Sequence, residues 1–281
     1  MWWHDRAGRF SRTKALCLAV CCAPAILLGA QWATGATGPR SLNFLNHACG
    51  DWALRFILAS LAVTPFREIF RAPRLFIIRR MLGLAGFCYL VAHVAFYIAL
   101  QNGRLGFVAS EIIKHSYMTI GLVAWLVFAS LAATSTDAMI ARMGVWWRRQ
   151  HALIYAAAAA GALHFMMQGK ITSPHATLQM GILLWLLAWR LCPRAWRGKS
   201  WFLAGYAVAI GLATAGLEGL WFALTTHANV PRILMANLRW GYAPRPAVWV
   251  LILGMAVVVA MMVRERRNFF FEKKKQKTFV N

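Results

Sequence analysis

Three histidines lie within, or at the edge of, long apolar stretches of this 281-residue chain. His93 is in CYLVAHVAFY, His164 is in GALHFMMQ, and His151 opens the Ala-rich stretch that leads to His164. An ionisable side chain among apolar neighbours is costly, and such residues usually pair, bind a ligand or relay protons. A neutral imidazole can form an interhelical hydrogen bond or bind a transition metal through one ring nitrogen.

The apolar stretches that carry these histidines belong to a series of eight. The chain is 60% hydrophobic with a mean hydropathy of +0.54, which is unusual for a soluble domain. Runs of about 20 apolar residues predict membrane-spanning helices, because a backbone in lipid must satisfy its own hydrogen bonds. We therefore expect an all-α, polytopic membrane helix bundle, whose first helix is retained and not cleaved as a signal peptide. The expected spans are about 15–34, 49–65, 81–101, 116–134, 150–168, 174–192, 201–224 and 247–263.

The strong positive charge of the chain, +23, indicates how the helices are oriented. Lys and Arg gather in alternate links, and the positive-inside rule puts such links, with both termini, in the cytoplasm. Contact with anionic lipids is a further expectation, and no nucleic-acid partner is needed to explain the charge. Four of these residues precede the first span, five are in 66–80, three in 135–149, four in 190–200 and seven follow 263, whereas the alternate links hold seven.

The expected topology places His93 and His164 at one depth. Both spans run outward, and both residues lie roughly 18–21 Å from the cytoplasmic side at about 1.5 Å per residue. Two neutral imidazoles at one depth on facing helices suit bis-His ligation of a haem iron. The small residues of 156–162 leave room for a flat macrocycle or for a close neighbouring helix. Interhelical hydrogen bonding is the alternative for either histidine.

His151 is a candidate ligand for a second haem. It lies about 20 Å along the helix from His164, so the two cannot bind one metal. At the matching depth, the third span offers Arg79 in place of a histidine. The alternative is an interfacial polar residue.

Several classes of site are not expected. The six cysteines are scattered and have no CxxC pair, which argues against a disulfide framework, a zinc site or an iron–sulfur site. Neither GxGxxG nor GxxxxGK[ST] occurs, so the chain has no nucleotide-binding domain of the usual kind.

At these residues the sequence resembles the MsrQ family, which belongs to the ferric-reductase-like transmembrane group. The motifs are GDWALRFILASLAVTP, TPFREIF, RRMLGLAGFCYLVAHVAFY, STDAM and WWRRQHALIYAAAAAGALHFMMQGK, and the resemblance covers about residues 40–192. It implies a haem-binding membrane subunit of the bacterial periplasmic methionine-sulfoxide reductase system. It also implies that His93, His164 and His151 are the haem-binding residues.

The resemblance further implies how the subunit works. It implies b-type haem, one or two per chain, with FMN as a further cofactor and a quinone as a possible one. Electrons pass from the quinone pool or a cytosolic flavin reductase, across the bacterial inner membrane, to a periplasmic molybdopterin-containing catalytic subunit that repairs oxidised envelope proteins. The chain itself is then an electron-transfer subunit without its own substrate-reducing site.

The resemblance also divides the chain. It implies a six-helix ferric-reductase-like core plus two extra C-terminal transmembrane helices. We expect an N-terminal tail and first transmembrane helix (1–40), the ferric-reductase-like haem-binding core (41–192), two additional transmembrane helices (193–263) and a basic cytoplasmic tail (264–281).

Two sets of polar residues remain without an assigned role. We expect Glu218 in the seventh span to pair with an arginine or to face the outer mouth, the alternative being a proton or quinone role. An outer polar set could bind haem propionates or a quinol, although Asp51 and Arg55 are at i,i+4 and can simply pair. The outer polar set is His47, Asp51, Arg55, His115, His175 and His227.

Two other functions fit the same sequence. A ferric or cupric metalloreductase would use the same haem with another acceptor. A transporter or assembly factor without haem would use the histidines only for hydrogen bonds.

Overall fold

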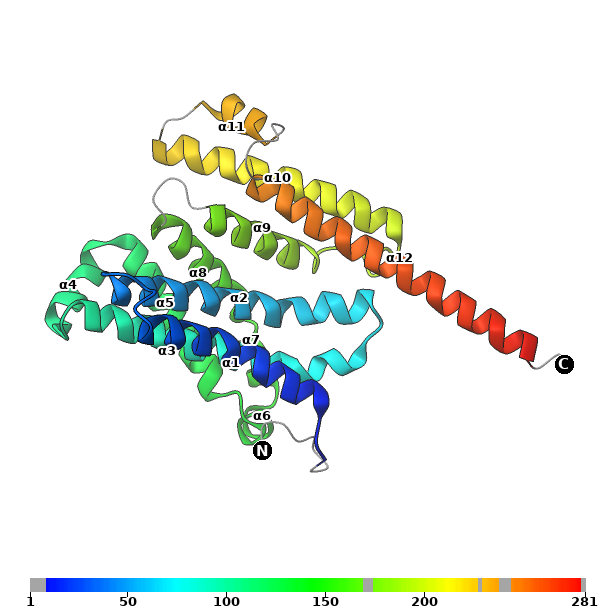
Figure 1. The fold of residues 1–281 in the computed structure, drawn as a ribbon, viewed down its shortest axis with the longest axis horizontal. Coiled ribbons are helices and arrows are strands. Elements are labelled where there is room, and N and C mark those ends of the chain that lie inside the picture. The colour runs from blue at the N-terminus through cyan, green and yellow to red at the C-terminus, as the bar shows by residue number, and fades with distance from the viewer. Residues whose placement is uncertain (1–8, 169–173, 227–228, 238–243, 279–281) are drawn as a thin grey trace. The chain divides into compact units, whose positions relative to one another are not determined.

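The computed structural model describes residues 9–168, 174–226, 229–237 and 244–278, and this part of the chain is helical (Figure 1). It forms two compact units. The first unit comprises Met1–Val63 and Arg74–Gln168, and the second comprises Thr64–Pro73 and Gly169–Asn281. The long helix α2 contributes to both, with its last turns in the second unit.

The first unit contains the three candidate histidines, His93, His151 and His164. Its longer helices are joined by shorter ones, of which α4 lies between α3 and α5, and α6 and α7 lie between α5 and α8. We use "α4 end" for the end of the bundle where α3 finishes and α5 starts, and "α6 end" for the opposite one. The elements are α1 (Arg12–Ala33), α2 (Ser41–Ile69), the 3-10 helix η1 (Pro73–Ile78), α3 (Arg79–Leu100), α4 (Leu105–Lys114), α5 (Ser116–Ala133), α6 (Asp137–Met143), α7 (Val145–His151) and α8 (Ile154–Gln168).

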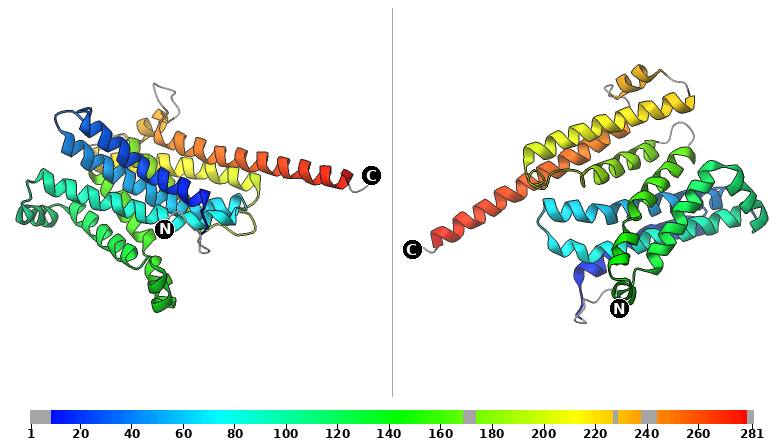
Figure 2. Two further views of the ribbon diagram at one scale, coloured as in Figure 1. Left: turned by 60° about the horizontal axis from the view of Figure 1, so that its bottom comes forward. Right: turned by 180° about the vertical axis from the view of Figure 1, so that it is seen from behind.

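The second unit is built on α10 and α12, which run side by side in both views of Figure 2, with α9 packed against both. Glycines allow this close packing. A methyl group on Gly254 would lie 2.6 Å from Cβ of Ala207, and one on Gly181 would lie 2.7 Å from Oγ1 of Thr214. The helices are α9 (Pro174–Ala188), α10 (Ser200–Thr226), α11 (Val230–Ala236) and α12 (Pro246–Thr278).

The helices confirm a polytopic helical membrane protein. Each of the eight expected spans coincides with a helix, namely α1, α2, α3, α5, α8, α9, α10 and α12. Five stretches of the described chain are long and apolar enough to cross a membrane, and α9 is a shorter apolar helix. The expected fifth span differs in one respect. α7 ends at His151 and α8 begins at Ile154, so His151 and His164 lie on consecutive helices and not on one continuous helix.

Helix α1 packs against its neighbours through Cys17, Cys21 and Leu28, and a tyrosine of α3 adds hydrogen bonds to its backbone. Pro24 lies inside α1 and removes one backbone donor from its hydrogen-bond ladder. The hydroxyl of Tyr89 accepts from the backbone N–H of Ala25 at 2.8 Å and donates to the carbonyl of Cys21 at 2.9 Å. In a regular helix these two backbone groups would bond to each other. Tyr89 is one turn before His93 on α3, so this contact helps to position the helix that carries His93.

Helices α5 and α8 pack closely because α8 presents small residues. Ala157, Ala158 and Ala162 are buried, and Ala158 is 0% exposed. Small side chains let two backbones approach in a membrane, where van der Waals packing replaces the hydrophobic effect between helices. The Ala-rich stretch is therefore a packing face.

Candidate haem site

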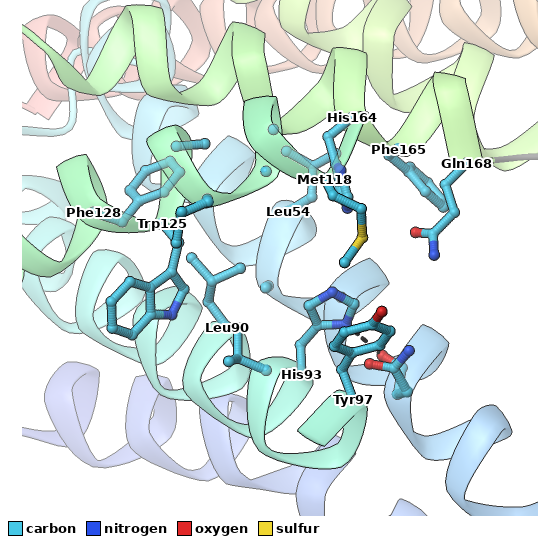
Figure 3. A pocket seen from close by; sticks show the side chains of 18 of the residues that line it. Leu54, Leu90, His93, Tyr97, Met118, Trp125, Phe128, His164, Phe165 and Gln168 are labelled. Atoms are coloured by element: carbon cyan, nitrogen blue, oxygen red, sulfur yellow. Dashed lines mark hydrogen bonds between the residues drawn. The ribbon is translucent and has the colours of Figure 1, made fainter. Parts of the chain in front are cut away.

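A cavity of about 220 Å³ lies within the first unit, bounded by α2, α3, α4, α5 and α8. His93 reaches it from α3 and His164 from α8, and the two side chains approach each other from opposite sides (Figure 3). Their ring centroids are 6.5 Å apart, with an angle of 79° between the ring planes. The structure thus brings together the two histidines for which the sequence predicts a common depth.

His93 is positioned by the facing turn of α2. Its Nδ1 lies 2.8 Å from the carbonyl oxygen of Asn46. Gly50, one turn further along α2, leaves the space that the ring occupies, because a methyl group there would lie 3.0 Å from the same nitrogen.

His164 is positioned in the same way by α5. Its Nδ1 lies 2.7 Å from the carbonyl oxygen of Tyr117, and a methyl group on Gly121 would lie only 2.8 Å from this nitrogen. Each histidine therefore has a carbonyl at one position of the neighbouring helix and a glycine four residues later. The two helix pairs, α2 with α3 and α5 with α8, repeat one local arrangement.

The hydrogen bonds determine which ring nitrogen is free. A carbonyl oxygen can only accept, so Nδ1 of each ring carries the proton and the lone pair is on Nε2. Two metal–nitrogen bonds of about 2 Å and half of each ring account for a centroid separation of about 6 Å. The observed 6.5 Å therefore suits one metal ion between the rings.

The remaining lining suits a macrocycle. Apolar side chains, among them Leu54, Leu90 and Phe128, line the part of the cavity toward the α6 end (Figure 3). In the described residues, no group of three or more His, Cys, Asp and Glu is placed to hold a metal ion. An ion between His93 and His164 would thus take its other ligands from a cofactor, as the iron of haem does.

Two polar atoms at this cavity have no hydrogen-bond partner in the described part of the protein. They are the side-chain oxygen Oδ1 of Asn46 and the indole Nε1 of Trp125, both buried. Buried polar atoms are normally satisfied, so these two indicate that a ligand or ordered water occupies the cavity.

His151 lies elsewhere and does not line the cavity. Its Nε2 is 3.3 Å from the hydroxyl of Ser135, its Nδ1 is 3.2 Å from the carbonyl of Trp147, and its ring stacks on that of Trp147. Arg79, which the sequence places at the depth of His151, accepts a hydrogen bond from the hydroxyl of Ser60 through its backbone carbonyl. Binding a metal would require His151 to give up a contact with Ser135, and its role as a second ligand stays a prediction.

The structure places the residues of the outer polar set in different parts of the protein. His47 and Asp51 line the cavity, and Asp51 pairs with Arg55 at 2.5 Å, as the i,i+4 spacing predicts. His115 pairs with Glu111 at 3.2 Å. His175 is on α9 in the second unit, and His227 lies outside the described residues.

Glu218 has the arginine partner expected from the sequence. It is buried in α10, its Oε1 accepts from Arg245 at 2.8 Å, and its Oε2 accepts from the amide of Asn237 at 3.3 Å. This cluster belongs to the second unit.

Sequence reasoning missed Gly50 and Gly121, which make room for the rings. The available signal is a repeated spacing, because Asn46 precedes Gly50 by four residues and Tyr117 precedes Gly121 by four residues in the two helices that face the histidines. A pair of glycines in equivalent places becomes informative only when the helix pairing is known.

The comparisons with known proteins define the class. Residues 48–162 match the family described as the ferric reductase like transmembrane component. This range includes two of the candidate histidines, His93 and His151, and ends before His164. No solved structure matches the chain.

Three relatives narrow the class of protein further. The chain is 39% identical over 194 residues to the protein-methionine-sulfoxide reductase heme-binding subunit MsrQ of Xanthomonas oryzae pv. oryzae, covering 66% of this chain and 87% of the relative. It is 37% identical over 185 residues to that of Rhizobium meliloti (66% and 84%) and 37% identical over 199 residues to that of Rhodospirillum rubrum (70% and 93%). The chain belongs to the MsrQ family of haem-binding subunits.

Proposed function

We propose that the axial ligands of the haem in this protein are His93 and His164, each binding the iron through Nε2. The observation that carries this assignment is the pair of rings at 6.5 Å with both Nδ1 atoms occupied by backbone carbonyls. A carbonyl partner fixes the tautomer and the ring orientation, and it makes the ligand nitrogen more basic.

The proposed role is transfer of electrons between a donor and a protein-methionine-sulfoxide reductase. A bound haem would supply one-electron redox chemistry, and with His93 and His164 both bound to the iron no position would be left for a substrate. The chain's own residues then hold the two imidazoles in place, and the apolar lining excludes water from the site. A dry environment influences the reduction potential.

The details of the pathway are also proposals. The charge pattern supports a membrane orientation with cytoplasmic termini. An inner-membrane location and delivery to a periplasmic molybdopterin-containing subunit are proposed from the family resemblance. We propose the quinone pool or a cytosolic flavin reductase as donor, b-type haem as the main cofactor, and FMN and quinone as further ones. A second haem at His151 near Arg79 and the four-part division of the chain given above belong to the same proposal.

Replacement of single histidines tests the site. The full chain with His93→Ala or His164→Ala should lose most of its haem, measured per chain from a reduced-minus-oxidised absorption spectrum. His175→Ala is the matched control, because His175 lies on α9 outside the site and should leave the haem content unchanged. We expect a smaller or different effect from His151→Ala, and equal haem in all four variants would refute the assignment.

A ferric or cupric metalloreductase is the second candidate, favoured by the match to the ferric reductase like family. The acceptor distinguishes the two functions. Oxidation of the reduced protein by a methionine-sulfoxide reductase catalytic subunit supports the first, and oxidation by ferric citrate alone supports the second.

A further inference from the structure

Two uncharged polar side chains lie at equivalent positions beside the two proposed haem ligands. Tyr97 follows His93 by four residues on α3, and Gln168 follows His164 by four residues on α8. Each is thus one helical turn beyond its histidine, toward the α4 end, and both line the cavity (Figure 3). Neither side chain has a hydrogen-bond partner in the described part of the chain.

A third polar group lies at the same end of the cavity. The side chain of Asn46 is 3% exposed, and its Oδ1 is buried without a partner, although the backbone carbonyl of the same residue is used by His93. An amide oxygen can only accept, so Asn46 binds an anionic group through its Nδ2 donors, after a half-turn of the amide that exchanges the places of its nitrogen and oxygen and leaves the shape of the side chain unchanged.

The opposite end of the cavity is different. Around Leu54, Leu90 and Phe128 the lining is apolar, and the indole N–H of Trp125 is the polar group there without a partner in the described residues. Among the residues that the structure describes, no Lys or Arg lines the cavity, and the carboxylate of Asp51 is paired with Arg55. A ligand with one polar and one apolar edge would therefore place its polar edge at the α4 end.

We propose that Tyr97, Gln168 and Asn46 bind the propionate carboxylates of the haem. This proposal rests on the haem site proposed above and adds its orientation, with the carboxylate edge at the α4 end and the apolar edge among Leu54, Leu90 and Phe128. An ionised carboxylate that enters an apolar cavity must find hydrogen bonds there. Hydroxyl and amide donors supply them, and hydrogen bonds to a charged acceptor are the stronger kind.

Blocked carboxylates provide the test. Full-length protein made without haem is reconstituted either with haem or with its dimethyl ester, in which both propionates are esterified, and the ratio of the two affinities is measured from the absorption spectra. We expect the unmodified chain to prefer haem over the ester. In the double variant Tyr97→Phe with Gln168→Leu this preference should fall by about tenfold for each hydrogen bond lost. Adding Asn46→Leu should lower it further.

The controls make the same chemical changes away from the cavity. Tyr206→Phe and Gln179→Leu alter a tyrosine and a glutamine of the second unit, and they should leave the ratio unchanged. Because the ratio compares two ligands on one variant, a general loss of stability cancels. The single variants, which keep the volume of each side chain nearly constant, are measured separately in case the double variant does not fold.

Two results would overturn the proposal while the haem site itself stands. In the first, the double variant binds haem and prefers it over the ester as strongly as the unmodified chain does. In the second, Trp125→Phe lowers this preference and the double variant does not. Failure of the unmodified chain to bind either porphyrin would instead contradict the proposed function.

Discussion

At the scale of single residues, the site depends on backbone groups as much as on histidines. The carbonyls of Asn46 and Tyr117 orient the rings, and Gly50 and Gly121 make room for them. The sequence predicts the histidines because an imidazole in an apolar span is unusual. A backbone carbonyl has no sequence signature, and a glycine has many uses, so these partners became identifiable only from the paired helices.

We predict that the glycine beside His164 is needed for haem binding. Gly121→Ala places a methyl group 2.8 Å from Nδ1, which forces the ring or α5 to move. Overpacking of this kind costs about 1–3 kcal/mol, so haem affinity should fall about tenfold or more. Gly50→Ala should act in the same direction with a smaller effect, because its methyl group would lie 3.0 Å from His93.

Titration of the haem-free chain with haem measures this change. Gly205→Ala on α10 is the control, since a methyl group there has no atom within 4 Å. Unchanged affinity in Gly121→Ala would show that the ring is not held as described.

At the scale of elements, the spans were predictable and the short helices were not. Long apolar runs give α1, α3, α5, α10 and α12 directly, because length and hydropathy suffice. The helices α4, α6, α7 and α11 lie in segments that the sequence assigns only as links. They have seven to ten residues, and packing against neighbours stabilises helices of this length more than their own propensity does.

We predict that Tyr89→Phe weakens the attachment of α1. The substitution removes the hydroxyl that links Ala25 N–H and the Cys21 carbonyl while keeping the aromatic ring that stacks on Phe56. The loss should be about 1–2 kcal/mol in the free energy of unfolding in mixed micelles.

Combining Tyr89→Phe with Pro24→Ala provides the control. Without the proline, α1 can form a regular ladder in which Ala25 bonds to Cys21 directly, so the tyrosine substitution should cost less in that background. Equal costs in both backgrounds would contradict the bridging role of Tyr89.

At the scale of the whole molecule, the proposed haem cavity lies within one compact unit and the Glu218 cluster within the other. The sequence predicts that α9 belongs to the haem-binding core, and in the structure α9 packs with α10 and α12. These helices are apolar on all sides. The pattern of apolar residues along the chain therefore does not identify which helices pack together.

We predict that the Glu218 pair stabilises the second unit and leaves the haem spectrum unchanged. Glu218→Leu leaves Arg245 without its carboxylate and should cost about 3 kcal/mol or more in unfolding free energy. The double variant Glu218→Leu with Arg245→Leu should be less destabilised, since no charge is left unpaired. An altered haem spectrum in the folded single variant would contradict the separation of the two sites.

The central claim is that His93 and His164 together bind one haem iron, and the electron paramagnetic resonance spectrum of the oxidised, full-length protein tests it most directly. The ring planes are at 79° to each other, and nearly perpendicular imidazoles give a low-spin ferric signal of unusually large anisotropy. We predict this signal in the unmodified chain and its replacement by a high-spin signal, or loss of haem, when either histidine becomes alanine. A high-spin signal in the unmodified chain, or a low-spin signal unaffected by both substitutions, would contradict the account.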